Sequence, residues 1–284
     1  MIEPLLKDER FLEDVERARC EQDRLHLWWL GQSGFLIHWR KSCLLIDPYL
    51  SDSLTRKYTS TDKPHVRMTA RVVAPEKLNF IDVVTSSHNH TDHLDAETLL
   101  TLRQANPTLQ MVIPEANRSF VAERLNADAA WPIGLDDGTS AGVAGFEFTG
   151  IPSAHETVER DEAGRCKFLG YVIGVGGLRI YHSGDTVGYE GLSARLRPFQ
   201  VDVALLPING ANPERRVAGN LNGVEAARLA HDAGARLVVP CHYEMFAFNT
   251  ASPAEFIEEA ERLSQPYRVL QCGERTEPIG ANKL

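Results

Sequence analysis

The amino-acid sequence predicts an α/β fold in which two mixed β-sheets pack together and helices cover both outer faces, a four-layer αββα sandwich. Segments typical of strands fill the first third of the chain and return in its middle. Each of these β-rich stretches leads into a region where strands alternate with helices. The chain has 284 residues and is 43% hydrophobic, so it can fill a core of the size that such a fold requires.

Three short apolar segments make up the first β-rich stretch. They are LHLWWLG, GFLIHW and SCLLIDPYL, at residues 25–31, 34–39 and 42–50. Glycine and proline punctuate them, which indicates neighbouring antiparallel strands. The polar segment that follows, 51–67, is expected to be a loop. Strands and helices then alternate, with strands expected at 80–87 and 109–114 and helices at 93–106 and 117–126.

The second half of the chain repeats this order. Strands are expected at 143–152, 168–175 and 178–184. The Gly176–Gly177 pair between the last two is a strong hairpin signal. The pattern then predicts strand, helix, strand, helix and strand, at 201–209, 223–234, 236–242, 253–264 and 267–272. Gly234 is expected to end the first of these two helices.

No internal repeat or flexible linker divides the chain, so we expect a single domain over residues 1–284. Residues 1–24 are expected to form a helical N-terminal extension. This extension is charged and amphipathic, a character that would allow it to pack against a neighbouring subunit in a homo-oligomer.

The composition limits the classes of partner. The chain carries 30 Lys plus Arg and 39 Asp plus Glu, a formal net charge of −9, which argues against nucleic acid as a partner while allowing a local basic pocket. The first residues lack the basic start and apolar run of a secretory signal, and no apolar stretch is long enough to span a membrane, so a soluble, cytoplasmic protein is expected. The five cysteines are scattered without a CxxC pair, which argues against disulfides or a cysteine-based zinc site.

The strongest functional signal is the segment SSHNHTDHLD, where four side chains of metal-ligand type fall within six positions. His88 and His90 follow a strand two residues apart, so both imidazoles can face one point. Asp92 and His93 lie at the turn into a helix. This density exceeds what one ion with an open site requires and suits two ions. The alternative, in which the four groups only cap the helix and bond one another, would leave buried polar groups without partners.

Further ligands are expected at the ends of later strands. His155 follows a strand in the loop SAHE, and its assignment depends on the upstream cluster because a loop histidine alone is more often solvated. Asp185 lies in YHSGDT, where a carboxylate can bridge two cations and reduce their repulsion. His242 ends RLVVPCH and is the candidate for the last ligand. Its neighbour Cys241 is expected to point to the opposite side of the strand as a core thiol.

The ordered set SSHNHTDHLD, His155, HSGDT and VVPCH resembles the metallo-β-lactamase fold superfamily over about residues 25–271. WLGQSGFLI and LLIDPYLS resemble the opening strands of that superfamily and its first Asp-containing motif, here Asp47. Within the superfamily, IYHSGDT, VDVALLPINGANPERR and ARLVVPCHYEMFAFNT are most similar to the L-ascorbate-6-phosphate lactonase branch of bacterial metal-dependent hydrolases.

The resemblance implies a centre for two divalent metal ions. One ion would be held by His88, His90 and His155, the other by Asp92, His93 and His242, with Asp185 between them. Asp47 would orient the metal-binding loop from behind the ligands. Imidazole and carboxylate ligands suit Zn or Mn, with Fe as an alternative.

Such a centre supplies a nucleophile at neutral pH. A divalent cation lowers the pKa of bound water from about 15.7 towards about 7, and the hydroxide that forms can attack a carbonyl carbon or phosphorus. The catalytic residues are then Asp185, between the ions, and Asp92, which can also pass a proton to the leaving group.

Candidates for other roles surround the ligands. His182 is either a partner of the ligand shell or substrate, or a core histidine on its strand. Substrate contacts are expected from two loops and from the residue after the last ligand: Arg56, Lys57, Tyr58, Asn209, Arg215, Arg216 and Tyr243. Adjacent arginines suit a phosphate, whereas solvated surface residues are the alternative for both loops. The remaining histidines are expected to be structural or exposed: His26, His38, His65 and His231.

The function expected from this site is hydrolysis of a small anionic lactone or ester, as in the lactonase branch. A phosphodiesterase acting on a nucleotide or phospholipid is the main alternative, because paired metals also stabilise displacement at phosphorus. Di-iron oxidoreductases of similar fold commonly carry Glu at the second histidine and an attached flavin domain, whereas residue 90 is His and no flavin domain is expected. A non-catalytic metal-binding protein is the last alternative, and the full ligand set argues against it because structural sites are normally closed with four ligands.

Overall fold

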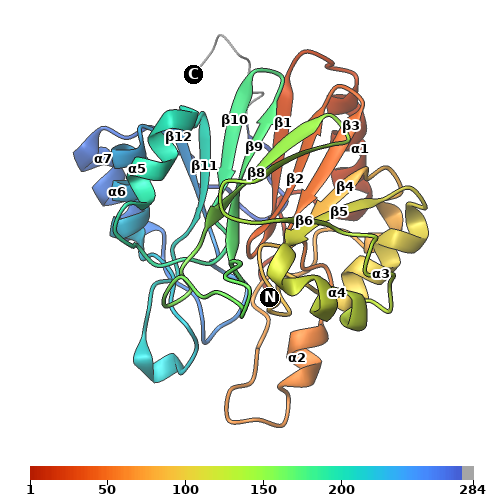
Figure 1. Cartoon of the computed structure of the whole chain (residues 1–284), viewed down its shortest axis with the longest axis horizontal. Coiled ribbons are helices and arrows are strands. Elements are labelled where there is room, and N and C mark those ends of the chain that lie inside the picture. The colour runs from red at the N-terminus through yellow and green to blue at the C-terminus, as the bar shows by residue number, and fades with distance from the viewer. Residues whose placement is uncertain (277–284) are drawn as a thin grey trace.

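The computed structural model describes residues 1–276 and contains two six-stranded β-sheets that lie face to face, with helices on both outer sides (Figure 1). The first sheet contains β1 (Leu25–Gly31), β2 (Gly34–Trp39), β3 (Ser42–Ile46), β4 (Val83–Thr85), β5 (Gln110–Pro114) and β6 (Ile133–Leu135). The second contains β7 (Ser140–Val143), β8 (Phe146–Pro152), β9 (Leu169–Val175), β10 (Leu178–His182), β11 (Val203–Pro207) and β12 (Leu237–Cys241). The α-helices are α1 (Asp8–Arg19), α2 (Ser53–Lys57), α3 (Ala96–Ala105), α4 (Arg118–Arg124), α5 (Leu192–Leu196), α6 (Gly223–Ala233) and α7 (Ala254–Leu263). The predicted fold class is confirmed.

Both sheets are mixed, which sets the direction of the strands that carry the site. In the first sheet β1, β2 and β3 are antiparallel neighbours, and β3 to β6 are parallel. In the second sheet β7 to β10 are antiparallel neighbours, and β10 to β12 are parallel. Strands β1, β3, β4 and β5 therefore all end at one edge of the first sheet. Strands β8, β10, β11 and β12 likewise end at one edge of the second.

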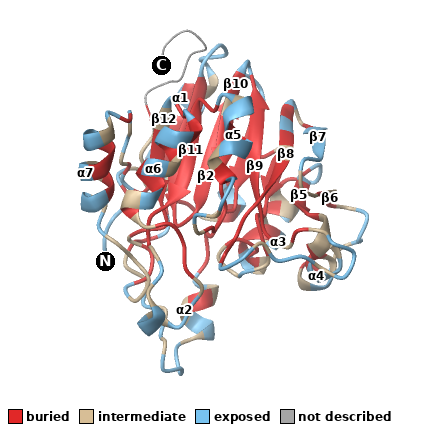
Figure 2. Cartoon of the chain, turned by 60° about the vertical axis from the view of Figure 1, so that its left-hand side comes forward, coloured by how far each residue is buried: buried red, intermediate tan, exposed pale blue. Residues whose placement is uncertain are grey.

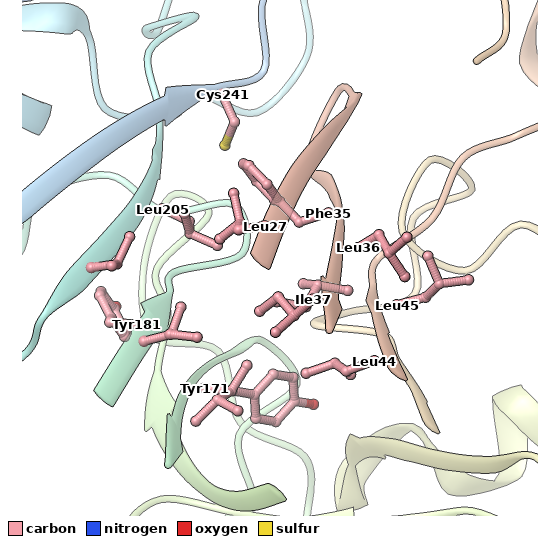
Figure 3. Packing of buried hydrophobic residues seen from close by; sticks show 14 of the residues in the cluster. Leu27, Phe35, Leu36, Ile37, Leu44, Leu45, Tyr171, Tyr181, Leu205 and Cys241 are labelled. Carbon is pink, nitrogen blue, oxygen red and sulfur yellow. The ribbon is translucent and has the colours of Figure 1, made fainter. Parts of the chain in front are cut away.

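The hydrophobic core lies between the two sheets. Leu27 and Phe35 of the first sheet meet Leu205 and Cys241 of the second in this layer (Figure 3). The strands are buried almost throughout, whereas α5, α6 and α7 are buried only on the sides that face the rest of the protein (Figure 2). Full burial of a side chain such as Leu27 contributes about 1.5–3 kcal/mol. The predicted core position of the Cys241 thiol is confirmed, and burial raises its pKa well above the usual range.

Helix α1 packs on the outer face of the first sheet, against β2. Its residues Phe11, Val15 and Ala18 are buried, at the i, i+4 and i+7 spacing of one helix face. Asp14 on the same helix accepts a hydrogen bond of 2.9 Å from the indole of Trp28. The apolar face of α1, which suggested contact with a neighbouring subunit, is therefore buried against the first sheet of the same chain.

Helix α6 covers β11 and β12 and contacts both α5 and α7. It begins with a capping box in which the Asn222 side chain accepts from the backbone of Glu225 and the Glu225 side chain accepts from the backbone of Asn222. It ends at Gly234, whose φ of 74° supports the predicted helix stop. Among residues 1–276, no helix combines the length and apolar character needed to cross a membrane.

Several sequence-based expectations differ from the structure. The expected closing strand at 267–272 is not a strand and forms only an isolated bridge between Val238 and Tyr267. The ladder stops there because Pro240, at the next paired position of β12, has no N–H to donate. The expected loop 51–67 contains the short helix α2. Strands β6 and β7 and helix α5 were not predicted, since β6 and β7 have three and four residues without apolar alternation.

An ion-pair cluster between α6 and α7 gives a pH-dependent prediction. Glu259 accepts hydrogen bonds from Arg262 and from Arg228 of α6, both at 2.6 Å, and these bonds lower its pKa to about 2. The stabilisation is therefore complete above the ordinary pKa of 4.5 and is lost as pH falls towards about 2. We expect Glu259→Gln to lower the midpoint of urea unfolding at pH 7, and the difference from wild type to shrink between pH 4.5 and 3.

Glu258→Gln is the matched control, because Glu258 is the exposed neighbour on the same helix and has no ion pair within residues 1–276. A difference between wild type and Glu259→Gln that does not change with pH would contradict this account.

Candidate metal centre

The predicted ligands all follow strands that end at the edges described above. The loop 86–95 follows β4, His155 follows β8, Asp185 follows β10 and His242 follows β12. The loop then leads directly into α3, because the side chain of Asp95 accepts a hydrogen bond from the backbone N–H of Thr98 and caps that helix. The strand order of both sheets thus delivers these side chains to one place.

Two groups of three side chains match the predicted division of the ligands. The potential ligand atoms of His88, His90 and His155 lie within 4.8 Å of one another. The same limit holds for the second group, Asp92, His93 and His242. His88, His93 and His242 are buried, whereas His90 is exposed and Asp92 half-buried, so both groups open onto the surface. The assignment of these residues as ligands stays a prediction, and the geometry is compatible with it.

Asp185 lies between the two groups, as expected for a bridging carboxylate. Its Oδ1 is 3.2 Å from His93 Nε2, and its Oδ2 is 3.4 Å from His242 Nε2 and 3.8 Å from His155 Nε2. Ligand atoms placed 2.0–2.2 Å from one tetrahedral ion lie roughly 3.4 Å apart, which matches these separations.

Asp185 reaches this position through a tight turn at Gly184. The φ of Gly184 is +60°, and a Cβ atom on it would lie 2.7 Å from Cβ of Ser87. Glycine is therefore required at this position both for its backbone conformation and for its close approach to the loop after β4.

Unpartnered polar atoms provide a test of whether these residues suit metal ions. Nε2 of His88, Nε2 of His93 and Oδ1 of Asp185 are buried and form no hydrogen bond within residues 1–276. Buried polar atoms are normally satisfied, since leaving one unpaired costs about 1–3 kcal/mol. All three belong to predicted metal ligands, so cations bound there would satisfy atoms that form no hydrogen bond within residues 1–276.

The charges of the cluster also suit the binding of cations. Burial would lower the pKa of His93, but the nearby carboxylates of Asp185 and Asp92 raise it well above the usual range. Burial likewise would raise the pKa of Asp185, but His93 and His242 hold it well below the usual range. The two carboxylates thus attract positive charge into this part of the cluster, which divalent cations would supply. At His88, burial lowers the pKa and keeps the imidazole neutral, as ligation requires.

Two of the histidines are held in the tautomer that a metal ligand needs. Nδ1 of His93 lies 2.8 Å from the Asp47 carboxylate, and Nδ1 of His155 lies 3.0 Å from the backbone oxygen of Gly219. Both oxygens only accept hydrogen bonds, so each Nδ1 carries a proton and Nε2 is the nitrogen directed to the cluster, where it can bind a cation once it has no proton. Asp47 therefore lies where it was expected, behind the ligand loop.

Asp47 is fully buried and also binds the start of the ligand loop. It accepts hydrogen bonds from the backbone N–H of Ser87 at 3.0 Å and from the hydroxyl of Thr85 at 2.8 Å. The hydroxyl of Ser87 also donates to it. Burial acts to raise the pKa of Asp47, but the hydrogen bond from His93 and the neighbouring histidines lower it, so the carboxylate stays ionised.

His182 supports the turn before Asp185. Its Nε2 lies 3.1 Å from the backbone oxygen of Ser33, and its Nδ1 accepts from the backbone N–H of Gly184 at 3.3 Å. Both ring nitrogens are occupied by backbone groups and the side chain is buried. Of the two expected roles, the structure favours a partner of the ligand shell over a substrate contact.

The cluster borders a cavity of about 370 Å³. Residues of both ligand groups line it, together with two cationic side chains, Lys57 and Arg124. Aromatic rings contribute a further wall, where Tyr58 stacks on His65 at 4.2 Å and Phe248 lies 4.5 Å from the same imidazole. This volume falls in the range of small-molecule sites.

The structure brings only two of the seven predicted substrate contacts, Lys57 and Tyr58, into this cavity. Arg56 is instead paired with Glu97. Arg215 donates to the backbone oxygens of Asn209 and Thr250, at 2.6 and 2.9 Å, and so serves the fold of its loop.

The other three candidates also lie outside the lining of the cavity. The buried Asn209 donates to the Asn249 side chain at 3.0 Å. The Tyr243 hydroxyl donates to the backbone oxygen of Leu270 in the interior. Arg216 pairs with Asp62 and lines a neighbouring surface hollow.

Sequence reasoning missed other residues of the cavity. Gln32 follows β1 in the tight turn GQSG. A polar side chain between two buried strands could have indicated from the sequence that Gln32 belongs to the site. Arg124 donates to the backbone oxygens of Asn89 and Leu94 in the ligand loop, at 2.7 and 3.3 Å, but its position on α4 carried no such signal. His65 was treated as structural or exposed and lies in the aromatic wall.

Comparison with known proteins agrees with this geometry. Residues 43–243 match the family model described as a beta-lactamase superfamily domain. That match spans well over half of the chain. The chain belongs to the metallo-β-lactamase superfamily.

Members of this superfamily resemble the chain over most of its length. It is 28% identical over 242 residues to a UPF0173 metal-dependent hydrolase of Methanosarcina mazei, covering 84% of this chain and 91% of that protein. It is 29% identical over 258 residues to a UPF0173 metal-dependent hydrolase of Opitutus terrae, covering 89% and 100%. A solved structure described as a possible metal-dependent hydrolase from Veillonella parvula shares the fold, with a TM-score of 0.69, 15% identity, and coverage of 89% and 99%.

The superfamily predicted from the motifs is therefore confirmed, and the chain is a metal-dependent hydrolase of the metallo-β-lactamase superfamily. The ascorbate-6-phosphate lactonase branch stays a prediction.

The first ligand group gives a prediction that needs no substrate. His90 is exposed, so His90→Ala removes an imidazole without opening a cavity in the core. We expect this variant to bind about one metal equivalent fewer per chain than wild type, measured by elemental analysis after reconstitution with Zn or Mn. His65→Ala is the control, because His65 lines the same cavity and belongs to neither ligand group. Equal metal content in His90→Ala and wild type would refute the assignment.

The position of Asp47 gives a second prediction. Asp47→Asn keeps the shape of the side chain but removes the charge that holds the Nδ1 proton of His93. We expect metal affinity at the second ligand group to fall by about 10- to 100-fold, as measured by competition with a chromophoric chelator. Asp82→Asn is the control, because Asp82 binds the backbone of Cys43 at the other end of β3. A folded Asp47→Asn variant with unchanged affinity would exclude this role.

Proposed function

We propose that this chain hydrolyses a small anionic lactone or ester bound in the 370 Å³ cavity beside the two ligand groups. The observation that carries the proposal is the charge of the cavity lining. Its only carboxylates are Asp92 and Asp185, which belong to the ligand cluster. The cations Lys57 and Arg124 form no ion pair with any residue of 1–276, so their charge is available to an anionic group of the substrate.

The aromatic wall supports a small substrate with some apolar surface. The His65 imidazole stacks on the ring of Tyr58 and contacts Phe248 and Phe246 edge-on, at 4.5 and 5.2 Å. These contacts hold the wall in place before a substrate enters. Aromatic rings and charged groups in the lining of one cavity favour a compact molecule that has both an apolar part and an anionic group.

Each residue of the centre has a physical role in this reaction. Divalent ions held by the two ligand groups would lower the pKa of a bound water and polarise the scissile carbonyl. Asp47 and the backbone oxygen of Gly219 keep protons on Nδ1 of His93 and His155, so that both Nε2 atoms are directed to the ligand cluster. Asp92 lines the cavity and is half-buried, so its carboxylate can take up a proton and deliver it to the leaving oxygen.

A phosphodiesterase is the second candidate, because paired ligand groups also suit in-line displacement at phosphorus. The two functions are separated by turnover on a panel that contains L-ascorbate 6-phosphate lactone, other sugar-phosphate lactones, anionic aryl esters and bis-p-nitrophenyl phosphate. We expect turnover of a lactone or ester after reconstitution with Zn or Mn. Turnover of the diester alone would refute the proposal in favour of the phosphodiesterase.

Lys57 provides a test of the charge argument. Loss of its ammonium group in Lys57→Ala should raise KM for an anionic substrate roughly tenfold with little change in kcat, since the lost contact acts equally on bound substrate and transition state. KM for a neutral ester of the same size should not change. Arg56→Ala is the matched control, because the adjacent Arg56 pairs with Glu97 outside the cavity. Equal effects of Lys57→Ala on anionic and neutral substrates would show that Lys57 does not recognise the anion.

A further inference from the structure

The side chain of Gln32 reaches from the turn between β1 and β2 into the second ligand group. Its backbone has a left-handed φ of 51°. The backbone oxygen of Gln32 accepts hydrogen bonds from the backbone N–H of His242 at 2.9 Å and from the indole of Trp29 at 3.0 Å. The turn is therefore tied to the end of β12, and the start of the Gln32 side chain is fixed relative to His242.

The amide of Gln32 contacts two of the predicted metal ligands. Its Nε2 lies 2.8 Å from Oδ2 of Asp92 and 2.9 Å from Nε2 of His242. An ionised carboxylate only accepts hydrogen bonds, so Asp92 determines that the NH₂ end of the amide faces the cluster. The second hydrogen of that NH₂ group is then directed at His242. Oε1 of Gln32 is buried and forms no hydrogen bond within the described part of the chain.

The hydrogen bond between Gln32 and His242 occupies the lone pair on His242 Nε2 that a cation would need. An amide NH₂ group has no acceptor site, so Nε2 of His242 must be the acceptor. A neutral imidazole nitrogen has a single lone pair, and His242 cannot give it to Gln32 and to a cation at the same time. Oδ2 of Asp92 has a further lone pair and is affected less.

The first ligand group has no comparable competitor. Within residues 1–276, no side-chain amide forms a hydrogen bond with His88, His90 or His155. The ring nitrogens of His88 and His155 that do have partners, both Nδ1, bond to Ser87 and to the backbone of Gly219. The Nε2 atoms of these two histidines remain directed to the cluster. The two groups therefore differ in what a cation must displace.

We propose that Gln32 makes the two cation positions unequal, so that a divalent cation binds first at the group of His88, His90 and His155. The group of Asp92, His93 and His242 binds a second cation only when the Gln32 amide releases His242. This inference rests on the two-cation centre of the proposed function and adds an order of loading to it. Loss of two hydrogen bonds, one of them to a charged group, weakens the second position by roughly 10- to 100-fold.

Removal of the amide distinguishes competition from ligation. In Gln32→Ala, water replaces the amide and is easier to displace than a tethered group. In Gln32→Met, the side chain keeps its length but has no donor. If the amide competes, both variants bind the second cation more tightly. If Gln32 instead turned Oε1 towards the cation and acted as a ligand, both variants would bind it more weakly.

The experiment measures stepwise dissociation constants of Zn²⁺ and Mn²⁺ on metal-free protein, by competition with a chromophoric chelator and by calorimetry. We expect two steps in wild type. In Gln32→Ala and Gln32→Met, the second Kd should fall by roughly 10- to 100-fold and the first should stay within about twofold. Gln104→Ala, on the exposed face of α3, is the control and should match wild type.

Three outcomes would overturn the inference. They are an unchanged or increased second Kd in both folded variants, equal shifts of both steps, and a single bound equivalent in all proteins. Circular dichroism and thermal unfolding establish that each variant is folded. If either Gln32→Ala or Gln32→Met does not fold, the other variant still tests the inference. The measurement uses no substrate, so absence of turnover on every compound of the panel would reject the proposed function and leave the loading order to be judged by these constants.

Discussion

The buried carboxylate of Asp47 is the interaction on which the candidate centre depends. It follows β3, and it accepts hydrogen bonds from Thr85 at the end of β4, from Ser87 and from His93. A buried charge without such partners would cost several kcal/mol, so the carboxylate and the loop after β4 require each other. The loop that carries His88 and His93 is consequently positioned by the sheet. A cation that binds there would find its predicted ligands already arranged.

The clustering of the predicted ligands could be expected from the sequence because each of them follows a strand. Apolar segments that end in HNHTDH, AHE, SGD or PCH indicate both the strand and the place where its polar residues begin. The ends of parallel strands meet at one edge of each sheet, and the two sheets lie face to face. Residues as distant as His88, after β4 of the first sheet, and His242, after β12 of the second, therefore converge without any knowledge of loop structure. The same logic failed at 267–272, where an apolar segment lies beside β12 but Pro240 removes the N–H that a further strand needs.

The substrate contacts could not be predicted in this way, because the direction of a loop side chain depends on partners from distant segments. Arg56 and Lys57 are neighbours on α2, yet the first is drawn to Glu97 on α3 and the second lines the cavity. Arg216 is drawn to Asp62 for the same reason. Nothing in the local sequence distinguishes an arginine that is neutralised by a carboxylate from a cation that is free to bind substrate.

The charges of the cavity connect metal loading with recognition of an anion. Asp92 and Asp185 oppose an approaching anion, and Lys57 and Arg124 only offset them. Divalent cations at the two ligand groups would reverse this balance, and each added cation would strengthen anion binding. By linkage, an anionic ligand must strengthen cation binding by the same factor. A second position weakened by Gln32 would therefore fill most readily when substrate is present, so that occupancy of the cavity helps to complete its own centre.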